Sequence, residues 1–219
     1  MAHVGGEERK IPNILSPACN ASRLVVIHWQ LAATSGNVTM KSHYASVPLT
    51  TKCKEDLKEV QAMLLDDARN LNLRSSVVQD AHFTLSVYGI DKSKRKEGET
   101  EEQLIESVNK LLQDFLQKRP PLELTFGGLG NFGTRMVFIN LTNEKQLGTL
   151  RQDMNDLLQK EGIFTTDNRF TPHVTLFREG SRRRFSKSSL TVQDLVSRKD
   201  IPPVAASPLT KIVFQKLRD

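Results

Sequence analysis

The sequence predicts an α+β fold in which two sheets are covered by helices on their outer sides. Three observations support this prediction. Short segments with alternating apolar residues are interspersed with longer segments whose apolar residues recur at helical spacing. Their order along the chain is strand, helix, strand, helix, hairpin, helix, strand, which is typical of α+β proteins. The length of 219 residues suits one domain, or two lobes that share a core.

The first half of this domain is expected to contain a strand, a helix and a second strand. The first strand spans residues 43–50, and Thr50 or Thr51 can cap a helix over residues 54–71. That helix carries an apolar stripe, which we assign to the core rather than to a partner-binding face. The second strand runs over residues 82–90.

The second half is expected to begin with a helix over residues 101–117, which a pair of prolines ends. Residues 122–126 and 136–141 are predicted to form a hairpin, with the glycine-rich segment between them as its turn. A third helix over residues 145–160 and a closing strand over residues 209–217 complete the domain.

A four-residue pattern, His-x-Thr-Leu, occurs at residues 82–85 and again at residues 173–176. With five histidines in the chain, a chance double match is on the order of one in a thousand. Because side chains alternate along a strand, the imidazole and the hydroxyl of each copy share one face. The apolar residues of each copy then point into a core.

Two such copies indicate acid and base catalysis at a phosphodiester. One of His82 and His173 would accept a proton while the other donates one, and Thr84 and Thr175 would bind the phosphoryl oxygens. A single histidine on a strand is more often a hydrogen-bonded structural residue, but the pair favours catalysis. No third ligand recurs at a fixed offset from either copy, so we predict no metal site and no cofactor. The pattern leaves open which histidine is the base.

The chain resembles the 2H phosphoesterases, a family defined by two His-x-Thr or His-x-Ser motifs on strands of a two-lobed fold. Residues 124–133 look like its Gly-x-Gly-x-Phe segment, and residues 43–50 look like its first strand. The resemblance covers residues 42–217. In particular, the chain is similar to the central domain of the A-kinase anchoring protein that carries such a module, and to viral and animal 2',5'-phosphodiesterases.

This resemblance implies the two-lobed, LigT-like fold, in which two antiparallel sheets form a central groove that brings both motifs together. It implies a 2H phosphoesterase domain over residues 42–219. Residues 1–41 are then an N-terminal extension that is partly disordered or packed on the domain.

The resemblance also implies a metal-independent phosphodiesterase that cleaves 2',5'-linked oligoadenylate and thereby antagonises antiviral signalling through RNase L. Two alternatives stay open. One is an enzyme that processes 2',3'-cyclic phosphates or RNA ends, and the other is a non-catalytic module that binds AMP. The presence of both proton-transfer groups favours an enzyme over a sensor.

Five residues are candidates for further contacts with the substrate. Phe132, Phe170 and Phe177 are aromatic side chains on which a base can stack, although each is also a candidate for the core. Arg178 and Arg182, which lies in a run of three arginines, are candidates for phosphate contacts, although charged runs are usually solvated.

The composition agrees with an anionic ligand. The formal charge is +6 and the isoelectric point is about 9.4. Cys19 and Cys53 are too few for a disulfide scaffold, so we expect a reducing compartment, the cytoplasm or the nucleus. The apolar run at residues 24–33 is too short to span a bilayer, and we expect no membrane association. We also expect a monomer.

Overall fold

The computed structural model describes three stretches of the chain, residues 38–167, 169–180 and 189–217. Residues 39–219 belong to one compact unit. Most of the expected N-terminal extension, including the apolar run at residues 24–33, lies outside the described residues. Among the helices that the structure describes, none is both long enough and apolar enough to cross a membrane.

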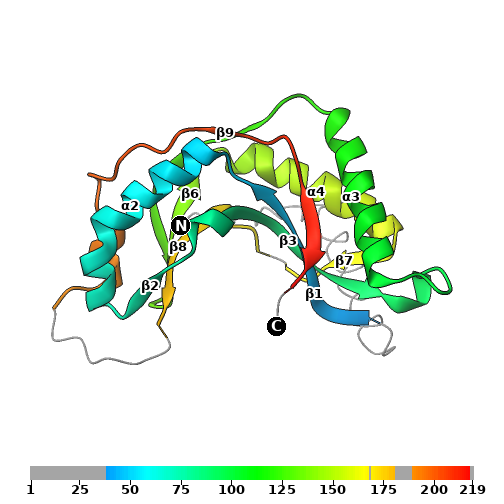
Figure 1. Cartoon of the computed structure of the whole chain (residues 1–219), viewed down its shortest axis with the longest axis horizontal. Coiled ribbons are helices and arrows are strands. Elements are labelled where there is room, and N and C mark those ends of the chain that lie inside the picture. Colours follow the sequence, from blue (N-terminus) through cyan, green and yellow to red (C-terminus); the bar gives the residue numbers. More distant parts are fainter. Residues whose placement is uncertain (1–37, 168, 181–188, 218–219) are drawn as a thin grey trace, which may run out of the picture. The chain divides into compact units, whose positions relative to one another are not determined.

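One four-stranded sheet carries the first His-x-Thr copy. Its strands, in spatial order, are β10 (Val213–Lys216), β1 (Val38–Pro48), β3 (His82–Asp91) and β7 (Ile163–Thr165). The edge strands β10 and β7 are antiparallel to their neighbours. Helix α3 (Glu101–Gln117) contacts β10, and helix α4 (Glu144–Lys160) contacts β7 (Figure 1).

A second, fully antiparallel sheet carries the other copy. Its strands, in spatial order, are β2 (Leu73–Ser75), β8 (His173–Glu179), β6 (Met136–Leu141) and β5 (Phe126–Phe132). Helix α2 (Thr51–Asn70) contacts β2 and β8, and the short helix α5 (Val192–Val196) contacts β5. A separate two-stranded pair is formed by β4 (Glu123–Leu124) and β9 (Ser207–Pro208). The expected class, α+β with two antiparallel sheets, is confirmed.

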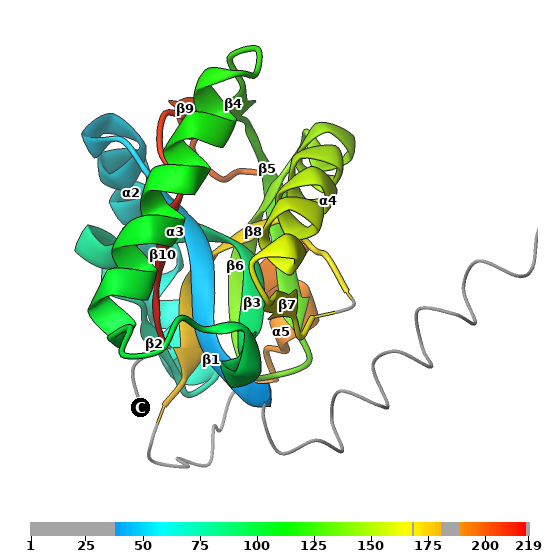
Figure 2. The ribbon, with the colours of Figure 1, turned by 90° about the vertical axis from the view of Figure 1, so that its right-hand side faces the viewer.

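The chain passes back and forth between the two sheets. Helix α2 follows β1 of the first sheet but packs on the second, and β7 of the first sheet leads directly toward β8 of the second. Strands β3 and β8 contact each other, and Figure 2 shows them side by side between the helices. This crossing brings the two His-x-Thr strands together.

Helices α2 and α3 begin where capping chemistry predicts. The Thr50 hydroxyl accepts a hydrogen bond from the Cys53 amide at 3.3 Å, which caps α2. Thr100 and Gln103 form a capping box at the start of α3. The expected helices over residues 54–71, 101–117 and 145–160 are confirmed, with shifts of up to three residues at their ends.

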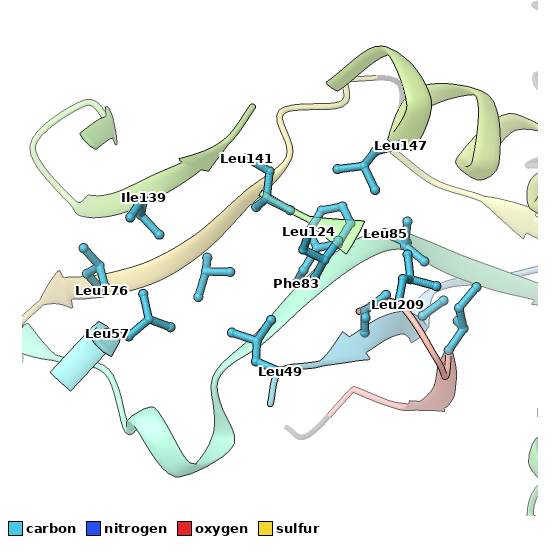
Figure 3. Packing of buried hydrophobic residues seen from close by; sticks show 14 of the residues in the cluster. Leu49, Leu57, Phe83, Leu85, Leu124, Ile139, Leu141, Leu147, Leu176 and Leu209 are labelled. Atoms are coloured by element: carbon cyan, nitrogen blue, oxygen red, sulfur yellow. The ribbon is translucent and has the colours of Figure 1, made fainter. Parts of the chain in front are cut away.

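The two sheets share one hydrophobic core. Phe83 and Leu85 of β3 and Val174 and Leu176 of β8 are at most 1% exposed. These are the apolar residues of the two His-x-Thr-Leu copies, and Figure 3 shows three of them among leucines from both sheets. Burial of each such side chain stabilises the fold by about 1.5–3 kcal/mol. The core therefore fixes the backbone that presents the histidines.

The predicted hairpin was wrong in its pairing. The glycine-rich segment is not a turn but the strand β5, which pairs with β6. The turn lies at Gly133, whose φ of 57° suits glycine. Residues 123 and 124 pair with β9 instead. Glycine has low strand propensity, so the pattern of β5 did not indicate a strand.

Two short strands, β2 and β7, were not predicted, and the expected closing strand is confined to β10. Two 3-10 helices, η1 (Val78–Asp80) and η2 (Lys92–Lys94), flank β3.

Candidate active site

The two His-x-Thr copies face one cavity, which we call the histidine cavity. Its volume is about 370 Å³, and both sheets contribute to its wall. Its wall includes the histidine and threonine of each motif and two arginines, namely His82, Thr84, His173, Thr175, Arg74 and Arg178. The four side chains predicted from the motif thus lie at one site.

Both imidazoles are oriented in the same way by the backbone. His82 Nδ1 lies 2.7 Å from the Asp80 carbonyl oxygen, and His173 Nδ1 lies 2.7 Å from the Thr171 carbonyl oxygen. A carbonyl oxygen only accepts hydrogen bonds, so each Nδ1 must carry a proton and donate it. In the neutral form, Nε2 of each ring is therefore the unprotonated nitrogen, ready to accept a proton. In its charged form, the same atom can donate one.

The two threonines complete the polar wall. Thr84 and Thr175 are both partly exposed within the cavity. The Thr175 hydroxyl donates to the Met136 sulfur at 3.6 Å, which is a weak acceptor. This hydroxyl is readily redirected toward a phosphoryl oxygen, a stronger acceptor.

His173 lies among aromatic rings. The Phe132 ring meets it edge to face at a centroid distance of 5.1 Å, and the Phe138 ring packs at 4.7 Å. The side chain of Phe138 has room because its cross-strand partner is Gly130, and a Cβ atom there would overlap the Phe138 ring. Burial lowers the pKa of His173, and the positive charges of Arg178 and His82 lower it further, against the opposing effect of the hydrogen bond to Thr171. His173 therefore favours the neutral state.

His82 has a different environment. The Tyr44 ring packs against it at a centroid distance of 5.6 Å. Gln215 of β10 donates a hydrogen bond of 2.5 Å to the Tyr44 hydroxyl and so holds that ring in place. Tyr44 and Gln215 line a second cavity of about 560 Å³, which shares the walls formed by His82, Thr84 and Arg178 with the histidine cavity. The site therefore extends from the second sheet across to the first.

A β-bulge changes which side chains of β8 face the cavity. Phe138 pairs with Thr175 while the adjacent Val137 pairs with Phe177, so one extra residue is inserted on β8. Strict alternation would place Phe177 beside Thr175. After the bulge, Phe177 is 0% exposed and belongs to the core, while Arg178 lines the cavity. The prediction that Phe177 stacks on a base was wrong for this reason.

The remaining candidates fall in different places. Phe132 is 44% exposed and lies beside His173, where a base can reach it. Phe170 packs on Phe83 at 6.1 Å and beneath the Arg151 guanidinium, and it lines neither cavity. Its ring packs partly buried against the core and outside both cavities, and its stacking on a base stays a prediction. Arg182 lies outside the described residues.

The other histidine in the described stretches, His43, has a structural environment. It is 1% exposed, stacks on Phe214 at 5.1 Å, and places Nε2 3.4 Å from a Glu101 carboxylate oxygen. Its burial lowers its pKa. Because His43 precedes Tyr44 on β1, the alternation of the strand sends one ring into the core and the other to the cavity.

Sequence reasoning missed several residues of the site. Arg74 lies on a strand too short to be recognised from its pattern, and Gln215 reaches the site only through the pairing of β10 with β1. Tyr44 could have been found, because alternation on β1 puts it on the face opposite to the buried Ala45. Within the described residues, no three His, Cys, Asp or Glu side chains gather as a group that could hold a metal ion.

Comparison with known families gives one match over most of the chain. Residues 41–201 match the family model of the AKAP7 2'5' RNA ligase-like domain. No curated protein sequence matches the chain significantly.

Solved structures share the fold at low sequence identity. E. coli LigT complexed with 3'-AMP is 18% identical, with a TM-score of 0.53 over 80% of this chain and 87% of that chain. The MHV ns2 PDE domain is 14% identical, with a TM-score of 0.53 over 82% of this chain and 100% of that chain. A further phosphoesterase is 17% identical, with a TM-score of 0.51 over 81% of this chain and 88% of that chain. These similarities confirm the expected two-lobed, LigT-like architecture.

Proposed function

Since this chain belongs to the family of the AKAP7 2'5' RNA ligase-like domain, within the 2H phosphoesterases, we propose that it cleaves 2',5'-linked oligoadenylate. The observation that carries this proposal is the pair of imidazoles, each with Nδ1 donating to a backbone carbonyl, in one cavity with two threonine hydroxyls. This arrangement supplies a proton acceptor, a proton donor and hydrogen-bond donors for a phosphoryl group.

In the proposed reaction, His173 is the base and His82 is the acid. The lowered pKa of His173 favours its neutral form, which suits proton acceptance. His173 Nε2 takes the proton of the ribose 3'-hydroxyl, and that oxygen attacks the phosphorus of the 2',5' linkage. The bond from phosphorus to the 5'-oxygen breaks, and protonated His82 Nε2 gives its proton to that oxygen. The products are a 2',3'-cyclic phosphate and a free 5'-hydroxyl.

The protein groups around this reaction have distinct proposed roles. Thr84 and Thr175 donate hydrogen bonds to the non-bridging oxygens, which gain negative charge in the transition state. Arg178 adds a positive charge to the same cavity. The exposed face of Phe132 beside His173 provides a surface on which an adenine can stack.

The test compares 2',5'- and 3',5'-linked adenylate trimers, incubated with the protein in EDTA and separated by chromatography. We expect cleavage of the 2',5' trimer only. His82→Ala and His173→Ala should each lower the rate by about 10²-fold or more, since general acid–base catalysis contributes 10²–10⁴-fold. His43→Ala is not a suitable control, because His43 is buried and its loss would destabilise the fold. The control is Lys58→Ala, at an exposed position of α2, which should cleave the 2',5' trimer at the rate of the unmodified protein.

Three outcomes would contradict parts of the proposal. Activity that depends on metal, and is lost in EDTA, would contradict the two-histidine mechanism. Cleavage of both linkages would remove the 2',5' specificity. Absence of cleavage, with AMP still bound, would favour a 2',3'-cyclic phosphate substrate or an AMP-binding module.

A role in antiviral signalling would follow from this activity. Removal of 2',5'-oligoadenylate lowers the concentration of the ligand through which RNase L signals, so the protein would antagonise that pathway. We propose the cytoplasm as its location, with the nucleus as the alternative. The free, buried thiol of Cys53 supports a reducing compartment.

A further inference from the structure

We propose that Arg74 and Arg178 form a subsite for a second phosphate group, so that the enzyme prefers oligonucleotides with at least two phosphates. This inference rests on the proposed function, because it specifies the substrate of the same cavity. Arg74 is the new element, since nothing in the motif or its spacing points to this residue.

The two arginines are an exposed cross-strand pair of like charge. Arg74 of β2 lies directly opposite Arg178 of β8, so their side chains extend from the same face of the sheet. Like charges in this position destabilise a sheet. In the described part of the chain, neither guanidinium forms an ion pair or a side-chain hydrogen bond that would offset the repulsion. By contrast, Arg119 pairs with Asp153 at 2.7 Å, Arg69 with Asp66 at 3.5 Å, and Arg135 with Glu179 at 3.6 Å.

Protection of an edge strand does not explain this pair. A charged residue on an edge strand such as β2 blocks pairing with another chain, and Arg74 alone would fit that role. Arg178, however, lies on the interior strand β8, and it reaches the cavity only because of the bulge between Thr175 and Phe177. The ladder is thus interrupted at the position that turns Arg178 toward the cavity beside Arg74.

The position of the pair identifies its ligand as a phosphate. Both arginines line the histidine cavity, whose one carboxylate among the described lining residues is that of Asp80. The fixed charge of its wall is therefore positive even with neutral imidazoles. Guanidinium groups bind phosphate through paired, charge-assisted hydrogen bonds. The two imidazoles and two threonines already serve the phosphate that reacts, so the arginine pair is available for a neighbouring one.

The first experiment measures binding without turnover. Calorimetry on the full chain would compare adenosine 2'-monophosphate with adenosine 2',5'-bisphosphate. We expect the bisphosphate to bind about tenfold more tightly or better, because the arginine pair adds charge-assisted hydrogen bonds to the second phosphate. In Arg74→Gln, this advantage should fall to about twofold or less. Arg74→Lys keeps the positive charge but loses the paired N–H donors of the guanidinium, and it should retain part of the preference for the bisphosphate.

Arg69→Gln is the matched control. Arg69 is an exposed arginine on α2 that pairs with Asp66 and lines neither cavity, so its replacement removes the same charge elsewhere. This variant should keep the full preference for the bisphosphate. A thermal melt of each variant separates a local effect from misfolding.

The second experiment locates the second phosphate in an oligonucleotide. The value of kcat/KM would be measured for A2'p5'A, for its 5'-phosphorylated form, and for the 2',5' trimer without a terminal phosphate. Preference for the phosphorylated dimer indicates a terminal phosphate, and preference for the trimer indicates the next internucleotide phosphate. Either preference should be lost in Arg74→Gln.

The two proposals fail in different ways. Equal binding of the two nucleotides, binding of neither, or a bisphosphate preference that survives in Arg74→Gln would overturn the second-phosphate subsite. A preference that depends on Arg74, together with no cleavage of any 2',5' substrate, would overturn the proposed reaction while leaving the subsite in place.

Discussion

In the proposed reaction, the pKa of a single side chain, His173, decides which imidazole is the base. Its ring is packed by Phe132 and Phe138 and faces the positive charge of Arg178, and burial is the largest cause of its lowered pKa. A base must be neutral, so a lowered pKa keeps the base competent at lower pH.

A pH profile tests this assignment. The value of kcat/KM should fall on the acid side with an apparent pKa below the ordinary histidine value of 6.5. In Arg178→Gln, loss of the neighbouring positive charge should raise the pKa of His173, so this acid limb should move to higher pH, whatever the loss in overall rate. An acid limb that stays in place would mean that His173 is not the base.

The residues of the candidate site were only partly predictable. The repeated motif identified His82 and His173, because a pattern of identical residues does not depend on tertiary structure. Arg74 could not be found, since its place in the cavity wall depends on the pairing of β2 with β8. Phe177 was misassigned because the bulge in β8 changes the alternation on which the prediction rested.

At the scale of single elements, β5 shows how a missing side chain on one strand makes room for a side chain of its neighbour. Gly130 has no side chain, which leaves space for the Phe138 ring, and that ring in turn packs on His173. The predicted turn was wrong because strand propensity measures the packing of a strand's own side chains. Here the packing that matters is that of Phe138, on the neighbouring strand β6, against His173.

Gly130→Ala should therefore impair catalysis through Phe138. The added Cβ would displace the ring, at a cost on the order of 1–3 kcal/mol in the free energy of unfolding, as expected for an overpacked site. Activity on the 2',5' trimer should fall as well, because the packing around His173 changes. Gly128→Ala is the matched control on the same strand, since a Cβ there meets no atom within 4 Å. Equal behaviour of the two variants would show that Phe138 does not position His173.

At the scale of the whole domain, the interleaved path of the chain makes the two sheets depend on each other. Helix α2 leaves β1 of the first sheet and packs on the second, and the core contains residues of β3 and β8. The three long helices could be predicted from periodicity, whereas the short helix α5 was not. The order of strands in each sheet could not, because pairing between distant segments such as β1 and β10 leaves no local pattern.

We expect the two sheets to unfold in one cooperative transition. Leu57→Ala in α2 and Leu112→Ala in α3 remove fully buried side chains, one from the helix on each sheet. Each should lower the free energy of unfolding by about 2–5 kcal/mol. Far-UV and near-UV circular dichroism should report the same midpoint in each variant. Two separate midpoints, with each substitution moving only one, would show that the sheets fold independently.

The matching backbone hydrogen bonds of His82 and His173 have a consequence for the direction of the reaction. Because each Nδ1 donates to the carbonyl oxygen two residues upstream, both rings keep the same nitrogen, Nε2, for proton transfer. After one transfer in the proposed cycle, the ring that began neutral is charged and the ring that began charged is neutral. The site is then set for the reverse process, in which a 5'-hydroxyl opens a cyclic phosphate. By microscopic reversibility, supply and removal of the products would decide whether such a site breaks the linkage or makes it.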